Sequence, residues 1–232
     1  MSVNRVLPVA STSPGSSRIR FTKHMYHQRV GFYAERILPS ILAMAMRQET
    51  LLPYRRRLAS RARGRVLEIG VGAGPNLPLY AADVQVVGVE PSPRLLTMAR
   101  AEAQKAGLAA ELKEGSAEAL PIDNESIDTV VTTWTLCSIP DTAAALREMR
   151  RVLKPSGQWL FVEHGLSPDK GVRRWQHWLT PLNRRVAGGC HLDRPIRTIV
   201  EAGGFTIEHL DQGYMKGPKP MTFMYEGTAR PR

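Results

Sequence analysis

The chain is poor in cysteine and contains no long hydrophobic run. Its 232 residues include two cysteines, Cys137 and Cys190, which are too few for the disulfide framework of a small secreted protein and predict a reducing compartment. No apolar stretch reaches the roughly 18 residues that a membrane span needs, and the longest candidate, residues 37–46, contains Pro39. The start of the chain also lacks the apolar core of a secretory signal. The sequence therefore predicts a cytoplasmic protein that does not cross a membrane.

Acidic residues are scarce in the N-terminal quarter of the chain. Residues 1–63 hold 12 of the 32 Lys and Arg residues but only Glu35 and Glu49 as acids, whereas residues 64–232 are nearly neutral. Residues 1–24 are rich in Ser, Pro and Arg without hydrophobic periodicity, which is typical of a flexible basic tail. Such a tail either meets phosphate, in nucleic acid or anionic lipid, or stays solvated without a partner.

Residues 25–63 have the hydrophobic pattern of an amphipathic helical segment. Ile37, Ile41 and Leu42 begin a repeat at steps of three and four residues, and Pro53 predicts a break in it. We expect these helices to pack on their own domain and close over a ligand, with contact to a membrane surface as the alternative. The basic residues expected on the solvent side are Arg55, Arg56, Arg57, Arg61 and Arg63.

An apolar run at residues 65–69 ends in glycines at alternate positions, Gly70, Gly72 and Gly74. The run suits a buried parallel strand, and the glycines indicate a turn whose backbone comes close to a ligand. Pro75 suits the first turn of a following helix. A dinucleotide fingerprint, G-x-G-x-x-G, would place its last glycine at Pro75, so the sequence disfavours a nicotinamide-dependent oxidoreductase.

Two acids complete this pattern. Glu68 opens an E-x-G-x-G-x-G segment, and Glu90 ends the next apolar strand, residues 84–89, where it could accept two hydrogen bonds from a ribose diol. These residues resemble the first two motifs of the class I S-adenosylmethionine-dependent methyltransferases, and residues 150–157 resemble a later motif. The resemblance implies an α/β fold over residues 64–232: a Rossmann-like, seven-stranded, mostly parallel sheet with helices on both faces and an antiparallel last strand.

The same resemblance implies S-adenosyl-L-methionine as methyl donor. Ser116 stands where the family usually has an Asp that holds the adenine amino group, so a charge-assisted hydrogen bond is lost there. The residues expected to bind the donor are Glu68, Gly70, Gly72, Gly74, Asn76, Glu90, Pro91, Ser92, Ser116, Ala117, Glu118 and Thr133.

The remaining elements follow from hydrophobic period and from capping residues. Asp141 is expected to cap one helix, and Gly107 to end another. The expected helices and strands are a helix from about residue 91 to 106, strands at 110–113 and 127–133, a helix after 141, a strand at 158–163 that delivers His164, and two final strands at 205–210 and 221–229.

Three short segments bear on the methyl acceptor: residues 135–138, the pair Glu163-His164, and residues 189–192. They look like the corresponding segments of the membrane-associated alkyl-thiol methyltransferases of animals and their bacterial relatives. This resemblance implies a small lipophilic thiol as acceptor. His164 is then the candidate that orients or deprotonates the acceptor, with a structural histidine as the equal alternative. Asp193 either completes a polar rim or, more simply, caps a helix.

Other readings stay open for the acceptor. A phospholipid amine or a quinone ring carbon are alternatives, and a membrane-surface or RNA-binding module is the non-enzymatic one. The chain lacks the Asn/Asp-Pro-Pro-aromatic motif of base methyltransferases, which disfavours nucleic acid. Two cysteines fall short of the three thiols of arsenic methyltransferases, so no metal is expected. Candidates for the wall of an acceptor pocket, with core packing as the equal alternative, are Trp134, Leu136, Cys137, Trp178 and Tyr214.

Overall fold

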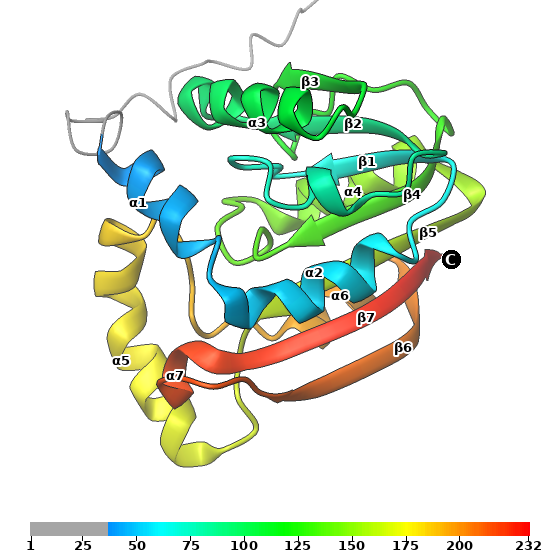
Figure 1. Cartoon of the computed structure of the whole chain (residues 1–232). Helices are drawn as coiled ribbons and strands as arrows, with labels where there is room; N and C mark the ends of the chain where they lie inside the picture. Colours follow the sequence, from blue (N-terminus) through cyan, green and yellow to red (C-terminus); the bar gives the residue numbers. More distant parts are fainter. Residues whose placement is uncertain (1–36) are drawn as a thin grey trace, which may run out of the picture. The chain divides into compact units, whose positions relative to one another are not determined.

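A single seven-stranded sheet forms the centre of the protein (Figure 1). The computed structural model describes residues 37–232. The strands are β1 (Arg65–Ile69), β2 (Gln85–Glu90), β3 (Ala110–Glu114), β4 (Ile127–Thr133), β5 (Leu153–His164), β6 (Phe205–Tyr214) and β7 (Phe223–Pro231). Their order is β3-β2-β1-β4-β5-β7-β6, in which only β7 runs antiparallel to its neighbours. This confirms the predicted mostly parallel sheet with an antiparallel last strand.

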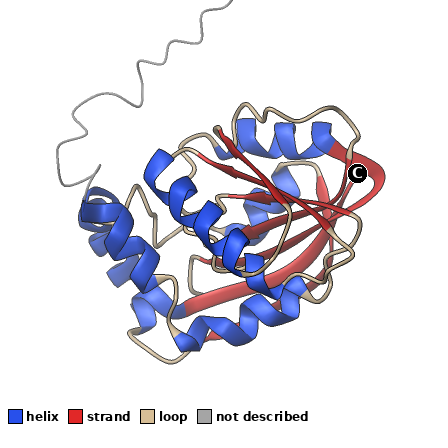
Figure 2. Ribbon diagram, turned by 45° about the horizontal axis from the view of Figure 1, so that its top comes forward, coloured by secondary structure: helices blue, strands red, loops and turns tan. Residues whose placement is uncertain are grey.

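Helices cover both faces of this sheet (Figure 2). They are α1 (Leu38–Ala45), α2 (Leu52–Ala59), α3 (Pro93–Lys105), α4 (Thr142–Val152), α5 (Lys170–Val186), α6 (Ile196–Ala202) and α7 (Lys219–Thr222), with short 3-10 turns η2 (Glu49–Leu51) and η3 (Leu77–Leu79). Residues of α4 and α6 pack in one core cluster, and residues of α2 and α3 in the other. The predicted helix caps are confirmed, since Asp141 Oδ1 accepts from Ala144 N at 2.9 Å and Gly107 has a φ of 64°.

The core lies on both sides of the central strands. In β1, Val66 packs with the α2 and α3 side, whereas Leu67 and Ile69 pack with the α4 and α6 side. Alternate side chains of a strand point to opposite faces, so a strand buried on both faces is apolar throughout. This explains why the apolar runs at β1, β2 and β4 were recognisable in the sequence.

The structure corrects several predicted boundaries. The helical break falls at residues 46–48 instead of Pro53, which lies in the first turn of α2, where a missing N–H costs no hydrogen bond. Pro75 starts no α-helix, because the chain from β1 to β2 forms only η3. β5 begins at Leu153, since that residue pairs with Ile127. The tail predicted at residues 1–24 lies outside the described residues, and of residues 37–232 no helix has the length and hydropathy to cross a bilayer.

Candidate active site

The carboxyl ends of the parallel strands converge at one edge of the sheet, where ligands bind in open α/β folds. β1 ends in the alternate glycines, β2 ends at Glu90, β4 ends at Thr133 and β5 ends at His164. The structure thus brings together at this edge the residues expected to bind the donor and the histidine expected to meet the acceptor.

The glycine loop after β1 is shaped for a close approach. Gly70, Gly72 and Gly74 have φ values of 69°, 57° and 78°, a region that favours glycine. A Cβ on Gly70 would lie 2.7 Å from the Thr135 side chain, so this glycine lets the chain after β4 pack against the loop. A Cβ on Gly72 would meet only the Gly70 carbonyl oxygen, at 3.9 Å. Protein packing does not require Gly72, which leaves its face open to a ligand.

Glu90 is fixed beside this loop. Its Oε2 accepts from Gly72 N at 3.1 Å, and its Oε1 accepts from Ser92 N at 3.0 Å. Burial raises the pKa of Glu90, while the two backbone N–H groups act in the opposite direction. Each carboxylate oxygen keeps a second lone pair for a hydroxyl donor. An open glycine turn beside an oriented carboxylate fits the ribose of S-adenosylmethionine.

A buried polar network holds the loop from below. Asn76 donates to Glu68 Oε1 at 2.8 Å and to Thr133 Oγ1 at 3.1 Å, and Tyr80 donates to Glu68 Oε2 at 2.8 Å. Burial raises the pKa of Glu68 to about 7. Glu68 and Asn76 are both almost fully buried. They tie the glycine loop to β1 and β4, and their expected contact with the donor stays a prediction.

Arg55 completes the network from α2, where the sequence analysis expected it to face solvent. That expectation is wrong: Arg55 is 3% exposed, and its Nη1 donates to Asn76 Oδ1 at 2.7 Å and Thr133 Oγ1 at 3.2 Å. Burial lowers the pKa of Arg55 to about 10, so it stays charged at neutral pH. A signal was present, because Arg55 shares one helical face with the buried Leu51, Leu58 and Ala59.

Trp134 occupies a strained position at the tip of β4. Its φ is 52°, a conformation that costs a side-chain-bearing residue about 1 to 3 kcal/mol. The backbone N–H of Trp134 donates to Val162 O at 2.8 Å, and the Arg55 guanidinium lies 4.8 Å from the centre of its ring. Strain of this kind is common at active sites. It fixes the turn that passes directly beside the glycine loop.

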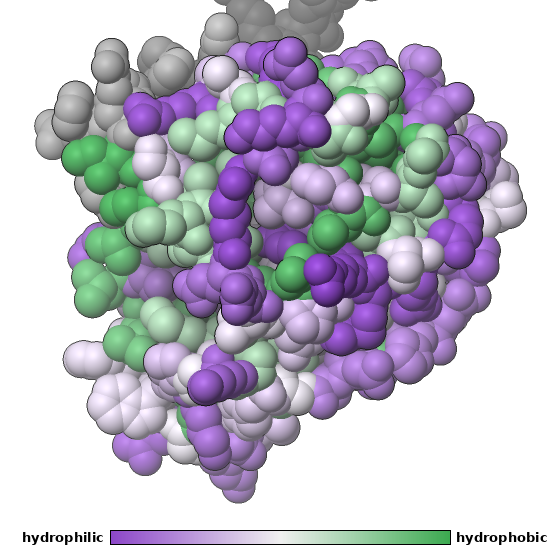
Figure 3. All heavy atoms as spheres, in the orientation of Figure 1, coloured by the Kyte–Doolittle hydropathy of each residue, from purple (hydrophilic) through white to green (hydrophobic). Residues whose placement is uncertain are grey.

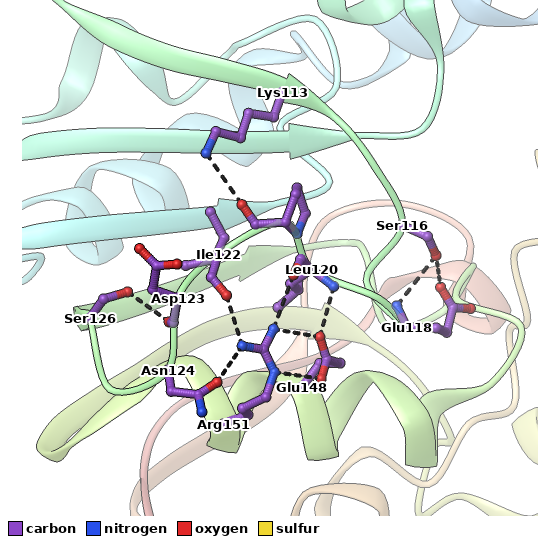
Figure 4. Close-up of polar contacts among 11 residues, drawn as sticks. Lys113, Ser116, Glu118, Leu120, Ile122, Asp123, Asn124, Ser126, Glu148 and Arg151 are labelled. Carbon is purple, nitrogen blue, oxygen red and sulfur yellow. Dashed lines mark hydrogen bonds and ion pairs between the residues drawn. The ribbon is translucent and has the colours of Figure 1, made fainter. Parts of the chain in front are cut away.

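The loop expected to meet adenine, residues 115–121, is clamped by α4 (Figure 4). Arg151 donates from Nη2 to Leu120 O at 3.0 Å and from Nη1 to Ile122 O at 2.8 Å, while Leu120 N donates to Glu148 Oε2 at 2.8 Å. Ser116 Oγ bonds to the Glu118 carboxylate within the loop. This clamp is not predicted from the sequence, because Arg151 and Glu148 lie 31 and 28 positions after Leu120. Adenine contact by Ser116, Ala117 and Glu118 stays a prediction.

A cluster of soft side chains lies at the other half of the edge. The sulfur atoms of Cys137 and Cys190 and a ring nitrogen of His164 lie within 4.8 Å of one another, with His164 Nε2 3.0 Å from Cys190 Sγ. The chain segment that carries Cys190 is tied to the one that carries Cys137 by a hydrogen bond from His191 N to Cys137 O at 2.8 Å. Residues far apart in sequence are thus held together by their backbones.

The two thiols of this cluster have pKa values that are shifted in opposite directions. A hydrogen bond between the two thiols lowers the pKa of Cys190 and raises that of Cys137, so Cys190 ionises first. Burial raises the pKa of the neighbouring Glu163 to about 8. Glu163 Oε1 and His164 Nδ1 are buried without a hydrogen-bond partner among the described residues. Orphaned buried polar atoms are uncommon in folded proteins.

The other candidates for the acceptor side are scattered. Trp178 is 71% exposed on α5 and does not wall a pocket. Tyr214, at the end of β6, donates to Asp169 Oδ2 at 2.8 Å and packs on Phe223. Leu136 is fully buried in the core. Asp193 does not cap α6, whose N-cap is Pro195; it lies 2.7 Å from His177 Nδ1 instead. Trp178 therefore lies on the surface and is not part of the Cys137, His164 and Cys190 cluster.

The sheet order, the glycine loop and the carboxylate after β2 are similar to those of the class I S-adenosylmethionine-dependent methyltransferases. Residues 67–161 match the methyltransferase domain family. These similarities indicate S-adenosylmethionine as the cofactor. Its binding by Glu90 and the glycine loop stays a prediction.

Known proteins similar to this chain differ in what they methylate. A phosphatidylethanolamine N-methyltransferase of Cereibacter sphaeroides is 38% identical over 50% of this chain and 60% of its own length. A thiol S-methyltransferase of Rattus norvegicus is 31% identical over 63% of this chain and 62% of its own length. The chain thus spans about three fifths of these relatives. The crystal structure of a putative methyltransferase from Bacillus halodurans shares the fold, with a TM-score of 0.63, 19% identity, and coverage of 78% and 99% of the two chains.

Proposed function

We propose that this chain transfers the methyl group of S-adenosylmethionine to the sulfur of a small lipophilic thiol. The observation that carries the proposal is the cluster of Cys137, His164 and Cys190 at the donor-binding edge. Its thiols and imidazole suit a soft, weakly polar acceptor, whereas an ammonium acceptor would call for an accessible carboxylate. The rat thiol S-methyltransferase among the relatives supports this choice.

The chain's own residues would act mainly by positioning. Bound S-adenosylmethionine supplies a methyl group on a positively charged sulfur. Glu90 and the glycine loop hold the donor, and the turn at Trp134 leads from the glycine loop to the segment that carries Cys137. A thiol is already partly ionised at neutral pH, so orientation in line with the methyl group can supply much of the catalysis. We assign His164 to the acceptor side, where it helps to hold the acceptor sulfur.

The test is a methyl-transfer assay with labelled S-adenosylmethionine and the whole chain. An alkyl thiol such as hexanethiol should yield a labelled thioether at a rate well above those with phosphatidylethanolamine micelles or a demethylated quinone. His164→Ala should lower thiol turnover while leaving the affinity for S-adenosylhomocysteine within about twofold. His191→Ala is the matched histidine control and should retain turnover. Labelled phospholipid in place of thioether would replace this proposal with the second candidate, a phospholipid N-methyltransferase, which the bacterial relative favours.

We also propose that the protein meets its acceptor at the surface of an anionic bilayer. The outer face of α5 exposes Trp175, Trp178 and Leu182 by 58%, 71% and 59%, and α1 beside it exposes Met44 by 71%. Figure 3 displays hydrophobic side chains over α1 and the adjoining part of α5. Exposed arginines flank the apolar stripe of α5, namely Arg174, Arg184 and Arg185. Large apolar side chains interleaved with basic ones are typical of helices that lie in a bilayer interface.

A further inference from the structure

We propose that Cys137, His164 and Cys190 form a binding site for a thiophilic divalent ion, best suited to Zn²⁺. Two thiolates and one imidazole are a preferred zinc donor set, and three protein ligands leave the fourth tetrahedral position open, as in catalytic zinc sites. No metal is expected from the sequence, because two cysteines fall short of the three thiols of arsenic methyltransferases. The structure brings their donor atoms to one point.

The distances suit a tetrahedral ion. Zinc bonds to sulfur at roughly 2.3 Å and to imidazole nitrogen at roughly 2.0 Å, which puts neighbouring donor atoms about 3.6 to 3.8 Å apart. The three donor atoms here lie within 4.8 Å of one another, and His164 Nε2 is 3.0 Å from Cys190 Sγ. A shift of about half an ångström in these side chains would therefore close the coordination shell.

The backbone around the cluster is fixed before any ion arrives. His191 N joins the two cysteine segments through Cys137 O. Arg194 donates to Leu136 O and, at 2.6 Å, to Ile139 O, which braces the turn that carries Cys137. Asn183 Nδ2 donates to Cys190 O at 2.9 Å. Ligands that are held in place lose little conformational entropy on binding, which favours affinity.

A divalent ion would balance the charge of the two thiolates that bind it. With the ion on His164 Nε2, the ring keeps its proton on Nδ1, which is buried without a partner in the described part of the chain. The converging donor atoms are therefore the observation that carries the inference.

Resting on the proposed function, the ion would activate the acceptor. The acceptor thiol takes the fourth position and loses its proton to solvent as its sulfur–metal bond forms. The bond from that sulfur to the donor's methyl carbon then forms while the bond from the methyl carbon to the donor's sulfur breaks, and its electron pair stays on the donor's sulfur. The product thioether is neutral and a weaker ligand, so it leaves the ion.

Cobalt substitution tests the site without any assay of activity. The metal-free whole chain is titrated with Co²⁺, and the expected result is one equivalent bound with near-ultraviolet sulfur-to-cobalt absorption and intense visible bands of tetrahedral cobalt. Because the chain has only two cysteines, this sulfur signal can come only from Cys137 and Cys190. Zn²⁺ should displace the cobalt. A wild-type chain that shows no sulfur-to-cobalt band at micromolar metal overturns the inference.

Variants identify the ligands. Cys190→Ser should weaken Zn²⁺ binding, measured by competition with a chromophoric chelator, by more than the about 10- to 100-fold that loss of an outer hydrogen bond costs a metal site. His164→Asn should do the same, while His191→Asn, the neighbouring histidine control, should bind as the wild type does. Unchanged affinity in Cys190→Ser would overturn the assignment, and circular dichroism checks that each variant is folded.

Different results would overturn the metal site and the proposed thiol methylation. Adding hexanethiol to the cobalt form should raise the sulfur-to-cobalt absorption by about half, as a third thiolate joins two. Thiol methylation that persists undiminished in chelator-treated protein would remove the ion from the reaction but keep the proposed function. Clear cobalt binding in a protein that methylates no thiol would keep the metal site and remove the proposed acceptor.

Discussion

Glu90 carries a carboxylate that is held in place by the backbone and still has lone pairs free for a ligand. The N–H groups of Gly72 and Ser92 fix its carboxylate, so its two oxygens present their remaining lone pairs to the space above the glycine loop. A carboxylate that is oriented in advance loses little freedom when a ribose binds. We therefore expect donor binding to be sensitive to the loss of this side chain.

Glu90→Ala should weaken binding of S-adenosylhomocysteine by about 30- to 150-fold, since two charge-assisted hydrogen bonds contribute roughly 2 to 3 kcal/mol together. Isothermal titration calorimetry measures the change. Glu114→Ala is the matched control, because Glu114 ends the neighbouring strand β3 but is exposed, and its affinity should match that of the wild type. Equal affinity in both variants would remove the assignment of Glu90 to the donor.

Glu68 makes the stability of the protein depend on pH. Its pKa is raised to about 7 by burial, so the folded state keeps a proton that the unfolded state releases near pH 4.5. This contribution is present below the unfolded pKa and is lost as the pH rises through 7. Between pH 5.5 and 7.5 the wild type should lose about 1 to 2 kcal/mol of unfolding free energy relative to Glu68→Gln. Urea unfolding at the two pH values tests this, and a constant difference between the two proteins would contradict it.

At the scale of elements, α2 supports the donor loop from outside the region that matches the methyltransferase domain family. It precedes the matched region of residues 67–161, yet Arg55 reaches from it to Asn76 and Thr133 under the donor loop. Arg57 and Arg61 of the same segment bond to Glu226 and Thr228 of β7. The helix thus connects the donor loop with the last strand.

Arg55→Ala should lower the unfolding free energy by about 2 to 4 kcal/mol, because Asn76 Oδ1 loses a buried charged donor. It should also weaken donor binding, since the glycine loop loses its support. Arg56→Ala, one residue further along α2 and exposed, should stay within about 0.5 kcal/mol of the wild type. Urea denaturation compares the two, and a loss in Arg55→Ala as small as that in Arg56→Ala would contradict a stabilising role for the buried Arg55 contacts.

How far the sequence predicts such elements depends on the range of the interactions. The strands β1, β2 and β4, the caps at Asp141 and Gly107, and the acid at the end of β2 follow from patterns within a few residues, and the structure confirms them. The burial of Arg55 depends on Thr133, which is 78 positions away, and a charged residue is a solvent-facing one by default. Trp178 was expected in a pocket for a similar reason: spacing identifies a helical face but not whether that face meets protein or solvent.

At the scale of the whole molecule, most of the large exposed apolar side chains among residues 37–232 lie on α1 and α5. The inner face of α5 is polar, with Gln176 and Thr180 buried, and Gln176 bonds to Ser167 and Gly165. Its large apolar residues face outward instead. A helix with this inverted arrangement gains little from its own domain, and an external apolar phase would complete it.

The double substitution Trp175→Ser and Trp178→Ser should weaken binding to vesicles of phosphatidylglycerol and phosphatidylcholine by about tenfold or more, because two large apolar side chains would no longer enter the interface. Vesicle co-sedimentation measures the loss, and binding should also fall with added salt. Arg147→Ala, on α4 and exposed, is the matched surface control. Binding that is indifferent to the two tryptophans would assign membrane contact to another surface or to none.

The bonds between α2 and β7 have a consequence for the order in which the protein matures on the ribosome. A chain is made from its N-terminus at about 5 to 20 residues per second, so Arg57 and Arg61 emerge well before Glu226 and Thr228, their partners more than 160 positions later. The helix that supports the donor loop must wait for the final strand. The central strands can therefore pair early, whereas the bonds that join Arg57 and Arg61 to β7 form only once β7 has been made.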